Sequence, residues 1–359
     1  MSHHGNYVTN ATAMEFLPVL EPLDKPKHGI WYSLVPTGSA PGVSVGHTCT
    51  FISSGDGEKG RIIIVGGANP SGSFSHTHVI NLDNHEWEVP DWKGLKPRYE
   101  HCSFVPESCP ESLWVFGGAE QSGNRSCIQN IRFTDSAPHW NDVTVGGKTP
   151  GPRTYHTNTA CLGNKLFVFS GGEAGAEAVS DQKLNIFDTV TSTWSQPDTK
   201  GRQPTARHGH IIVGVGSKVY VHGGMTGNKF YSDMYCLHTE IMKWEKVQTK
   251  GDIPAGVAAH SAVVQGKNIY IFGGMTADGA TNLMFRFNTE KSRWILMKFE
   301  GDLPPNRLDH SMCVLPWTVQ ADGDGNSSGT SDTKHLAFVF GGMDTEGVLH
   351  NDCVVTVLT

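Results

Sequence analysis

The chain has 359 residues, with 35 acidic and 28 basic side chains and a formal net charge of −7. This negative balance argues against nucleic acid or an anionic membrane as a direct partner. The sequence has no apolar run of the roughly 20 residues that a membrane-spanning helix requires, and its polar first residues lack the pattern of a signal peptide.

Residues 1–28 form an N-terminal extension that we expect to be mostly irregular. The segment is polar at its start and proline-rich between Leu17 and Pro22, and it shows no hydrophobic periodicity. We expect no dimerisation domain or ubiquitin-ligase adaptor domain in so short a stretch. The apolar run at residues 31–35, which begins with Trp31, is the first predicted strand.

A run of strand-forming residues that ends in two glycines then occurs six times. Successive first glycines lie 51, 54, 52, 50 and 68 residues apart, which fits propeller blades and is too long for a helical solenoid. The chain holds 42 glycines, well above the usual share of about 7%. The pairs are Gly66 and Gly67, Gly117 and Gly118, Gly171 and Gly172, Gly223 and Gly224, Gly273 and Gly274, and Gly341 and Gly342.

Other residues stand at regular offsets from these pairs. A histidine precedes each pair, and in five repeats a tryptophan follows the second glycine by 20 to 22 residues. The sixth repeat lacks this tryptophan, whereas Trp31 precedes the first histidine. A closed ring accounts for both facts. The histidines are His47, His101, His156, His210, His260 and His310, and the tryptophans are Trp87, Trp140, Trp194, Trp244 and Trp294.

These motifs resemble the kelch repeat over residues 30–359. The resemblance implies an all-β chain that forms a single six-bladed β-propeller at residues 29–359. In each blade the first strand begins at the histidine, the second ends in the glycine pair, and the fourth carries the tryptophan. The N-terminal strand would supply the fourth strand of the last blade, which leaves no free sheet edge.

An acidic insert interrupts the sixth repeat at about residues 319–334. It is rich in aspartate, glycine and serine, including Asp322 and Asp324, and such a composition cannot bury a core. We therefore expect the insert to be disordered. Its length explains the long spacing before the last glycine pair.

The eight cysteines show no paired spacing and no C-x-x-C motif. Four of them fall in predicted first strands, and three fall near predicted third strands. Buried free thiols in a reducing compartment account for this pattern better than a disulfide framework does. We expect a cytosolic protein.

An arginine stands three residues before four of the histidines. In a blade the start of the first strand and the end of the second lie at one edge, so these arginines and the loops after the glycine pairs should surround one mouth of the ring. Arginine offers a two-pronged donor to carboxylates, and we hypothesise that this mouth binds a partner. The alternative is that the arginines only brace adjacent blades. The predicted binding residues are Arg98, Arg153, Arg207, Arg307, Asn69, Glu120, Thr226, Asp278 and Asp344.

Two classes of function compete, because fold alone does not decide function. A kelch-type enzyme would need a metal or an acid and base in the mouth. A copper oxidase of this type would need cysteine and tyrosine beside copper-binding histidines, which the chain does not present together. The repeat histidines lie on different blades, and we interpret them as structural. We expect no catalytic residue, metal or cofactor, and a binding scaffold is favoured; a kelch peptide-binding adaptor is the other alternative.

Several segments show a narrower resemblance to the kelch-motif effectors of a late-endosomal Rab GTPase: residues 17–22, 65–70, 97–101, 121–125, 307–313 and 340–343. Residues 1–13 look like an extra leader, and the acidic insert looks shorter than in mammalian relatives. The resemblance implies binding to the GTP-bound GTPase and a role in transport from endosomes to the trans-Golgi network, including recycling of mannose 6-phosphate receptors. It also implies a cytoplasmic protein that its partner recruits to these membranes, with no direct membrane anchor.

Overall fold

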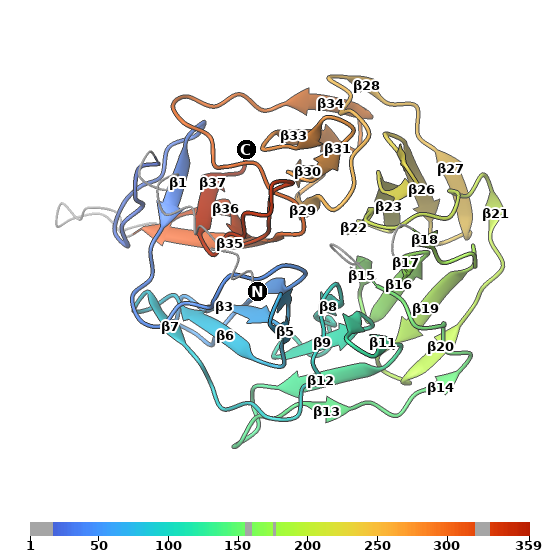
Figure 1. Cartoon of the computed structure of the whole chain (residues 1–359), viewed down its shortest axis with the longest axis horizontal. Coiled ribbons are helices and arrows are strands. Elements are labelled where there is room, and N and C mark those ends of the chain that lie inside the picture. Colours follow the sequence, from blue (N-terminus) through green and yellow to red (C-terminus); the bar gives the residue numbers. More distant parts are fainter. Residues whose placement is uncertain (1–16, 155–159, 175–176, 320–330) are drawn as a thin grey trace, which may run out of the picture.

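The computed structural model describes residues 17–154, 160–174, 177–319 and 331–359. All regular elements in these ranges are β-strands, and they form six blades around a central axis (Figure 1). No helix of the described residues is long and apolar enough to cross a membrane. The predicted six-bladed β-propeller is confirmed.

The blades are numbered here along the chain, with strands given from the axis outward. Blades 1 and 2 are β2 (Thr48–Ile52), β3 (Arg61–Val65), β6 (Thr77–Asn81) and β7 (Glu86–Glu88), then β8 (Cys102–Phe104), β9 (Ser112–Phe116), β12 (Ile128–Arg132) and β13 (Asn141–Asp142). Blade 3 is β15 (Ala160–Leu162), β16 (Lys165–Phe169), β19 (Leu184–Asp188) and β20 (Thr193–Ser195), with β14 (Gly146–Gly147) outside them.

Blades 4 and 5 also carry a fifth, parallel strand at the outer edge. Blade 4 is β22 (Ile211–Val215), β23 (Lys218–His222), β26 (Met234–His238), β27 (Lys243–Lys246) and β21 (Lys200–Gly201). Blade 5 is β29 (Ser261–Gln265), β30 (Asn268–Phe272), β33 (Met284–Asn288), β34 (Arg293–Leu296) and β28 (Lys250–Gly251). Blade 6 is β35 (Ser311–Val319), β36 (Asp332–Phe340), β37 (Cys353–Val357) and β1 (Trp31–Leu34).

Blade 6 is built from both ends of the chain. β1 pairs antiparallel with β37, with Trp31 opposite Thr356 and Leu34 opposite Cys353. Trp31 is fully buried, and its ring centroid lies 5.0 Å from that of Phe272 in blade 5. The predicted closure by the N-terminal strand is therefore confirmed, and Trp31 also joins blade 6 to blade 5.

The described part of the N-terminal extension packs against this closing strand. Leu17 and Leu20 are buried, and the Leu20 amide donates a hydrogen bond to the Ser33 carbonyl at 2.9 Å. Farther along, the Trp317 indole donates to the Asp24 carbonyl at 2.9 Å. Leu17 shares a hydrophobic cluster with Trp31, and Leu20 shares another with Leu34. The domain boundary expected at residue 28 stays a prediction. Residues 1–16 lie outside the described residues.

The hairpin of β35 and β36 extends into the predicted insert. Val319 pairs with Asp332, and Thr318 with Thr333, so both ends of the insert expected at 319–334 are strand. The buried Trp317, which packs edge-on against His85 at 5.5 Å, anchors this extension to blade 1. The remaining insert, residues 320–330, lies outside the described residues, and its predicted disorder stays a prediction.

The glycine pairs are required for two reasons: the backbone adopts a left-handed conformation, and there is no room for a Cβ atom. Gly66 and Gly67 have φ of 66° and 102°, which lie in the left-handed region. A Cβ on Gly66 would lie 2.4 Å from the Arg98 carbonyl oxygen of the next blade. A side chain on Gly66 would therefore separate two blades, whereas one on Gly67 would lie 3.2 Å from Ser44 and His47 of its own blade.

We predict that replacing Trp31 by alanine destabilises the fold by about 3–5 kcal/mol, because it leaves a large cavity between blades 5 and 6. Deleting residues up to Val35 should have a larger effect, since it exposes the edge of β37. Denaturant unfolding measures both changes. Val19→Ala is the matched control, because Val19 is 46% exposed. A Trp31 variant as stable as this control would contradict the closure.

We also predict that mild acid destabilises the propeller. Burial lowers the pKa of His47 to about 4 and that of His310 to about 3, from 6.5. Above pH 6.5 neither the folded nor the unfolded chain protonates these rings. Below pH 6.5 the two rings become protonated in the unfolded chain but stay neutral in the folded chain. At pH 5.5 the free energy of unfolding should therefore be lower by about 1 kcal/mol for each ring. Equal urea midpoints at pH 7.5 and pH 5.5 would refute this.

Candidate functional site: the mouth of the propeller

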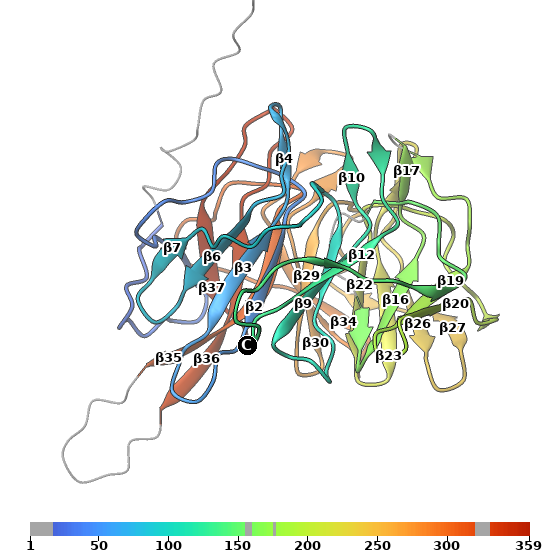
Figure 2. The same cartoon turned by 90° about the horizontal axis from the view of Figure 1, so that it is seen from below.

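One face of the ring carries a short hairpin after each of five glycine pairs. These hairpins rise on the same side of the molecule, as β4, β10 and β17 show in Figure 2. We call this side the hairpin face and its central opening the mouth. The hairpins are β4 (Ala68–Asn69) with β5 (Gly72–Ser73), β10 (Ala119–Glu120) with β11 (Gly123–Asn124), β17 (Gly172–Ala174) with β18 (Glu177–Ala178), β24 (Met225–Thr226) with β25 (Lys229–Phe230), and β31 (Met275–Thr276) with β32 (Gly279–Ala280).

A chain of backbone hydrogen bonds runs around the mouth. Its members are the residues that directly precede a repeat histidine, and all of those described have positive φ: Gly46, Glu100, Gly209, Ala259 and Asp309. The Glu100 amide donates to Gly46 at 2.7 Å, Gly46 to Asp309 at 3.1 Å, Asp309 to Ala259 at 3.0 Å, and Ala259 to Gly209 at 2.8 Å. These bonds join blades 2, 1, 6, 5 and 4 directly. The equivalent residue of blade 3, like His156, is outside the described residues.

The four repeat arginines lie beneath the hairpin face and are at most 1% exposed. Arg307 donates to the Gly341 carbonyl at 3.1 Å and forms a two-pronged ion pair with Asp352, at 2.7 and 2.9 Å. Burial alone would raise the pKa of Asp352, but the adjacent Arg307 outweighs it, and the pKa is lowered. The carbonyl of Arg307 accepts a hydrogen bond from Gly274 of the preceding blade.

The other arginines repeat this arrangement. Arg207 donates to the Gly223 carbonyl, pairs with Asp233 at 2.5 Å, and stacks 4.1 Å from the Tyr231 ring centroid. Arg98 donates to the Gly117 carbonyl and to Gln129, and Arg153 donates to the Ser170 carbonyl at 3.1 Å. These side-chain contacts lie within the blade of each arginine, whereas the arginine carbonyls accept hydrogen bonds from glycines of the preceding blade. The guanidinium groups are buried, and partner binding by the four arginines stays a prediction.

The five other predicted residues lie on the hairpin face, and the structure brings them to its rim. Three of them stabilise the turns in which they lie: Asn69 accepts from the Ser71 amide, Glu120 pairs with Arg125 at 2.6 Å, and Asp344 accepts from the Glu346 and Val348 amides. Thr226 joins its hairpin to the loop before β22 by donating to the Ala206 carbonyl. Asp278 is exposed at the tip of the β31–β32 hairpin. Partner binding by these residues stays a prediction.

A hollow of about 470 Å³ occupies the centre of the mouth. The predicted binding residues do not include its lining, which combines apolar side chains with carboxylates. Most of these lining residues occupy two kinds of position in the repeat. Some stand between the repeat arginine and histidine, and others stand directly after the glycine pair. The lining includes Tyr99, Glu100, Glu173, Met225, Met275 and Leu308.

The exposed charges of the described hairpin face are mainly negative. Glu173, Glu177, Asp278 and Glu346 are exposed there, Lys229 is an exposed cation, and Arg125 is paired with Glu120. The expected cationic mouth is therefore acidic at its surface, because the arginines that motivated the expectation are buried. Such a surface favours a partner that presents basic side chains.

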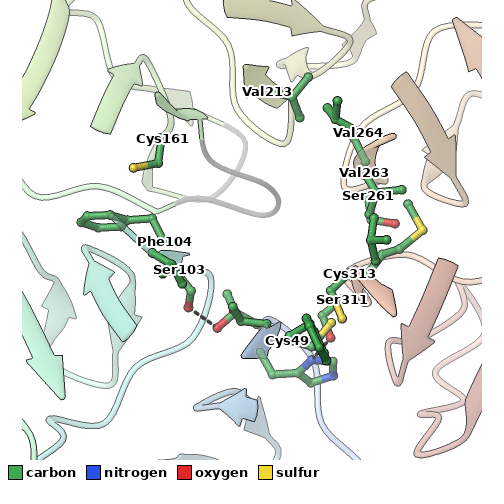
Figure 3. A pocket seen from close by; sticks show the side chains of 18 of the residues that line it. Cys49, Ser103, Phe104, Cys161, Val213, Ser261, Val263, Val264, Ser311 and Cys313 are labelled. Carbon is green, nitrogen blue, oxygen red and sulfur yellow. Dashed lines mark hydrogen bonds between the residues drawn. The ribbon is translucent and has the colours of Figure 1, made fainter. Parts of the chain in front are cut away.

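A second cavity of about 420 Å³ lies along the axis between the innermost strands (Figure 3). Its polar side chains bond to one another: Thr48 contacts Ser103 at 2.5 Å, and His47 contacts Ser311 at 2.8 Å. Among the described residues, no group of three or more His, Cys, Asp or Glu side chains could hold a metal ion. The wall also carries apolar side chains, among them Phe104, Val213 and Val264.

Comparison with known proteins agrees with this architecture. The model of the KLHDC2/KLHL20/DRC7 Kelch-repeats domain matches residues 46–274, and the Kelch motif model matches residues 257–298. A zebrafish (Danio rerio) protein named Rab9 effector protein with kelch motifs is 66% identical over 355 residues, covering 96% of this chain and 100% of its own length.

Relatives from other vertebrates carry the same name. The Xenopus laevis protein is 58% identical over 367 residues and the human protein 49% over 373 residues, each covering 96% of this chain and 100% of the relative. The likeness thus extends beyond the repeats to nearly the whole chain. The chain belongs to the kelch-repeat family and, within it, to the Rab9 effector proteins with kelch motifs.

Proposed function

We propose that this protein is a non-catalytic scaffold that binds the GTP-loaded form of a late-endosomal Rab GTPase. In this role it assists transport from endosomes to the trans-Golgi network, including recycling of mannose 6-phosphate receptors. The observation that carries the proposal is the near full-length likeness to relatives named Rab9 effector proteins. The propeller supplies a rigid platform with shaped loops, which is sufficient for binding.

Selection of the nucleotide state follows from the chemistry of small GTPases. The γ-phosphate and its Mg²⁺ order two switch loops, and these loops are released after hydrolysis. A partner that contacts the ordered loops binds the GTP state more tightly and so favours that state. In this proposal the GTPase also brings the cytoplasmic protein to endosomal and trans-Golgi membranes.

We propose the hairpin face as the docking surface. Its hairpins differ in sequence, whereas the strands beneath them repeat. The hairpins can therefore recognise one particular partner while the strands hold them in fixed positions. The central hollow has apolar walls formed by Tyr99, Met225, Met275 and Leu308, and its acidic rim is complementary to basic side chains. The buried arginines hold the hairpins in place from below.

We predict that purified protein retains GTP-loaded Rab9 in a pull-down and retains the GDP-loaded form weakly. A panel of other Rab proteins, each loaded with either nucleotide, tests the choice of partner. Equal retention of both nucleotide forms would contradict an effector role.

We predict that Glu173→Lys with Asp278→Lys weakens GTPase binding at least tenfold, because two exposed carboxylates of the rim become cations. The matched control is Glu107→Lys with Glu240→Lys, which reverses two exposed carboxylates on loops at the opposite face. Both variants should melt as the wild type does. Loss of binding in the control alone would place the GTPase on that other face.

We predict that Arg207→Ala destabilises the propeller by about 3–5 kcal/mol, because Asp233 is left without its cation and the Gly223 carbonyl loses its donor. Arg153→Ala with Arg207→Ala should be less stable still. Folding is followed by thermal melting, and GTPase binding is measured at a temperature where the variant is folded. A double variant with wild-type melting and no GTPase binding would instead show that the arginines contact the partner.

A further inference from the structure

Three cysteines meet where the first blade joins the last. Cys49 lies on β2, Cys313 on β35 and Cys353 on β37, and all three are buried in one hydrophobic cluster. β2 and β35 are the innermost strands of blades 1 and 6 and lie side by side around the channel. All eight cysteines of the chain are free thiols.

Cys49 and Cys313 also line the axial channel, where they lie together on one wall (Figure 3). A hydrogen bond links the two thiols, and this bond, together with burial, raises the pKa of Cys313. Cys161 lines the channel as well, but it lies on the other side of the opening. The contact between Cys49 and Cys313 therefore joins two blades across the seam of the ring.

We propose that Cys49 and Cys313 are a redox modification site, at which a small peroxide that enters the axial channel converts the two thiols into a reversible disulfide. The channel has about 420 Å³ of space, enough for hydrogen peroxide to reach both sulfur atoms. In a reducing compartment the two cysteines stay as thiols, so the disulfide would form only when peroxide is present.

The chemistry proceeds in two displacements. Only a thiolate attacks a peroxide, and because the pKa of Cys313 is raised we assign the first attack to Cys49. The oxygen–oxygen bond breaks, hydroxide leaves, and Cys49 becomes a sulfenic acid. Cys313 then loses its proton and attacks the Cys49 sulfur, which releases the second oxygen as water. Two thiols give up two electrons and two protons, and the peroxide is reduced to two water molecules.

The consequence for the fold is a covalent link between its first and last blades. Reduced, the ring is closed by the pairing of β1 with β37 and by packing along the seam. The disulfide would restrict the unfolded chain over nearly the whole propeller, and such long loops give the larger stabilisations. Because the raised pKa of Cys313 keeps the fraction of its thiolate small, the attack of Cys313 on the Cys49 sulfenic acid should become faster as pH rises.

The test treats the full chain with hydrogen peroxide, blocks remaining thiols with an alkylating agent, and maps the peptides by mass spectrometry. We expect a peptide pair joined through Cys49 and Cys313 that has lost the mass of two hydrogen atoms, and its reversal by dithiothreitol. We also expect the melting temperature to rise by about 3–10 °C on oxidation and to return on reduction.

Matched variants make the assignment specific. Cys313→Ser should abolish both the linked peptide and the rise in melting temperature, whereas Cys161→Ser, a change at another cysteine of the channel, should abolish neither. Peptide mapping of the wild type tests the pair even where a variant folds poorly. Oxidation of Cys161 without a link between Cys49 and Cys313 would overturn the proposal, and so would a link that uses Cys353 in place of either.

Discussion

The structure depends on contact between neighbouring blades at the mouth, where the backbone itself forms the joint. A blade can bury its two faces only against other blades, so the ring is stable when each blade is fixed to the next. The residue before each described repeat histidine has positive φ, and the amides of Gly46, Glu100, Ala259 and Asp309 bond to the same position of the adjacent blade. At two of these positions the residue with positive φ is a glycine, Gly46 or Gly209. Glu100, Ala259 and Asp309 adopt the same left-handed conformation although they carry side chains. The glycine pairs and the buried arginines strengthen the same joints.

The ring and its closure could be predicted from the sequence because both depend on residue types that no other residue type can replace at those positions. The first glycine of the pair, at which a Cβ would lie against the next blade, must repeat, and Trp31 had no place except in the blade that lacked a tryptophan. The site was harder to predict. The spacing placed Arg98, Arg153, Arg207 and Arg307 at the mouth correctly, but spacing does not show whether a side chain points outward or inward. Partners such as Asp233 and Asp352, which keep two of these charges inside, stand 26 and 45 residues away in sequence.

Buried cations and exposed carboxylates give the hairpin face its character. Arginine is suited to the buried position because its five donors can satisfy a glycine carbonyl and a carboxylate at once. With those donors occupied, the surface is set by the hairpin tips, which vary from blade to blade. The geometry that repeats from blade to blade therefore lies below the surface, and the residues that differ between blades lie above it.

Closure by the two chain ends has a consequence for synthesis on the ribosome. β1 leaves the ribosome before any other strand, yet its partner β37 is made last, and Trp31 finds Thr356 only when the whole propeller exists. During translation blade 1 has no neighbour on one side, and β1 has no sheet to join. The final pairing is thus the contact with nearly the greatest separation along the chain, and contacts of this kind form slowly. We expect nascent chains to rely on chaperones until their last residues emerge.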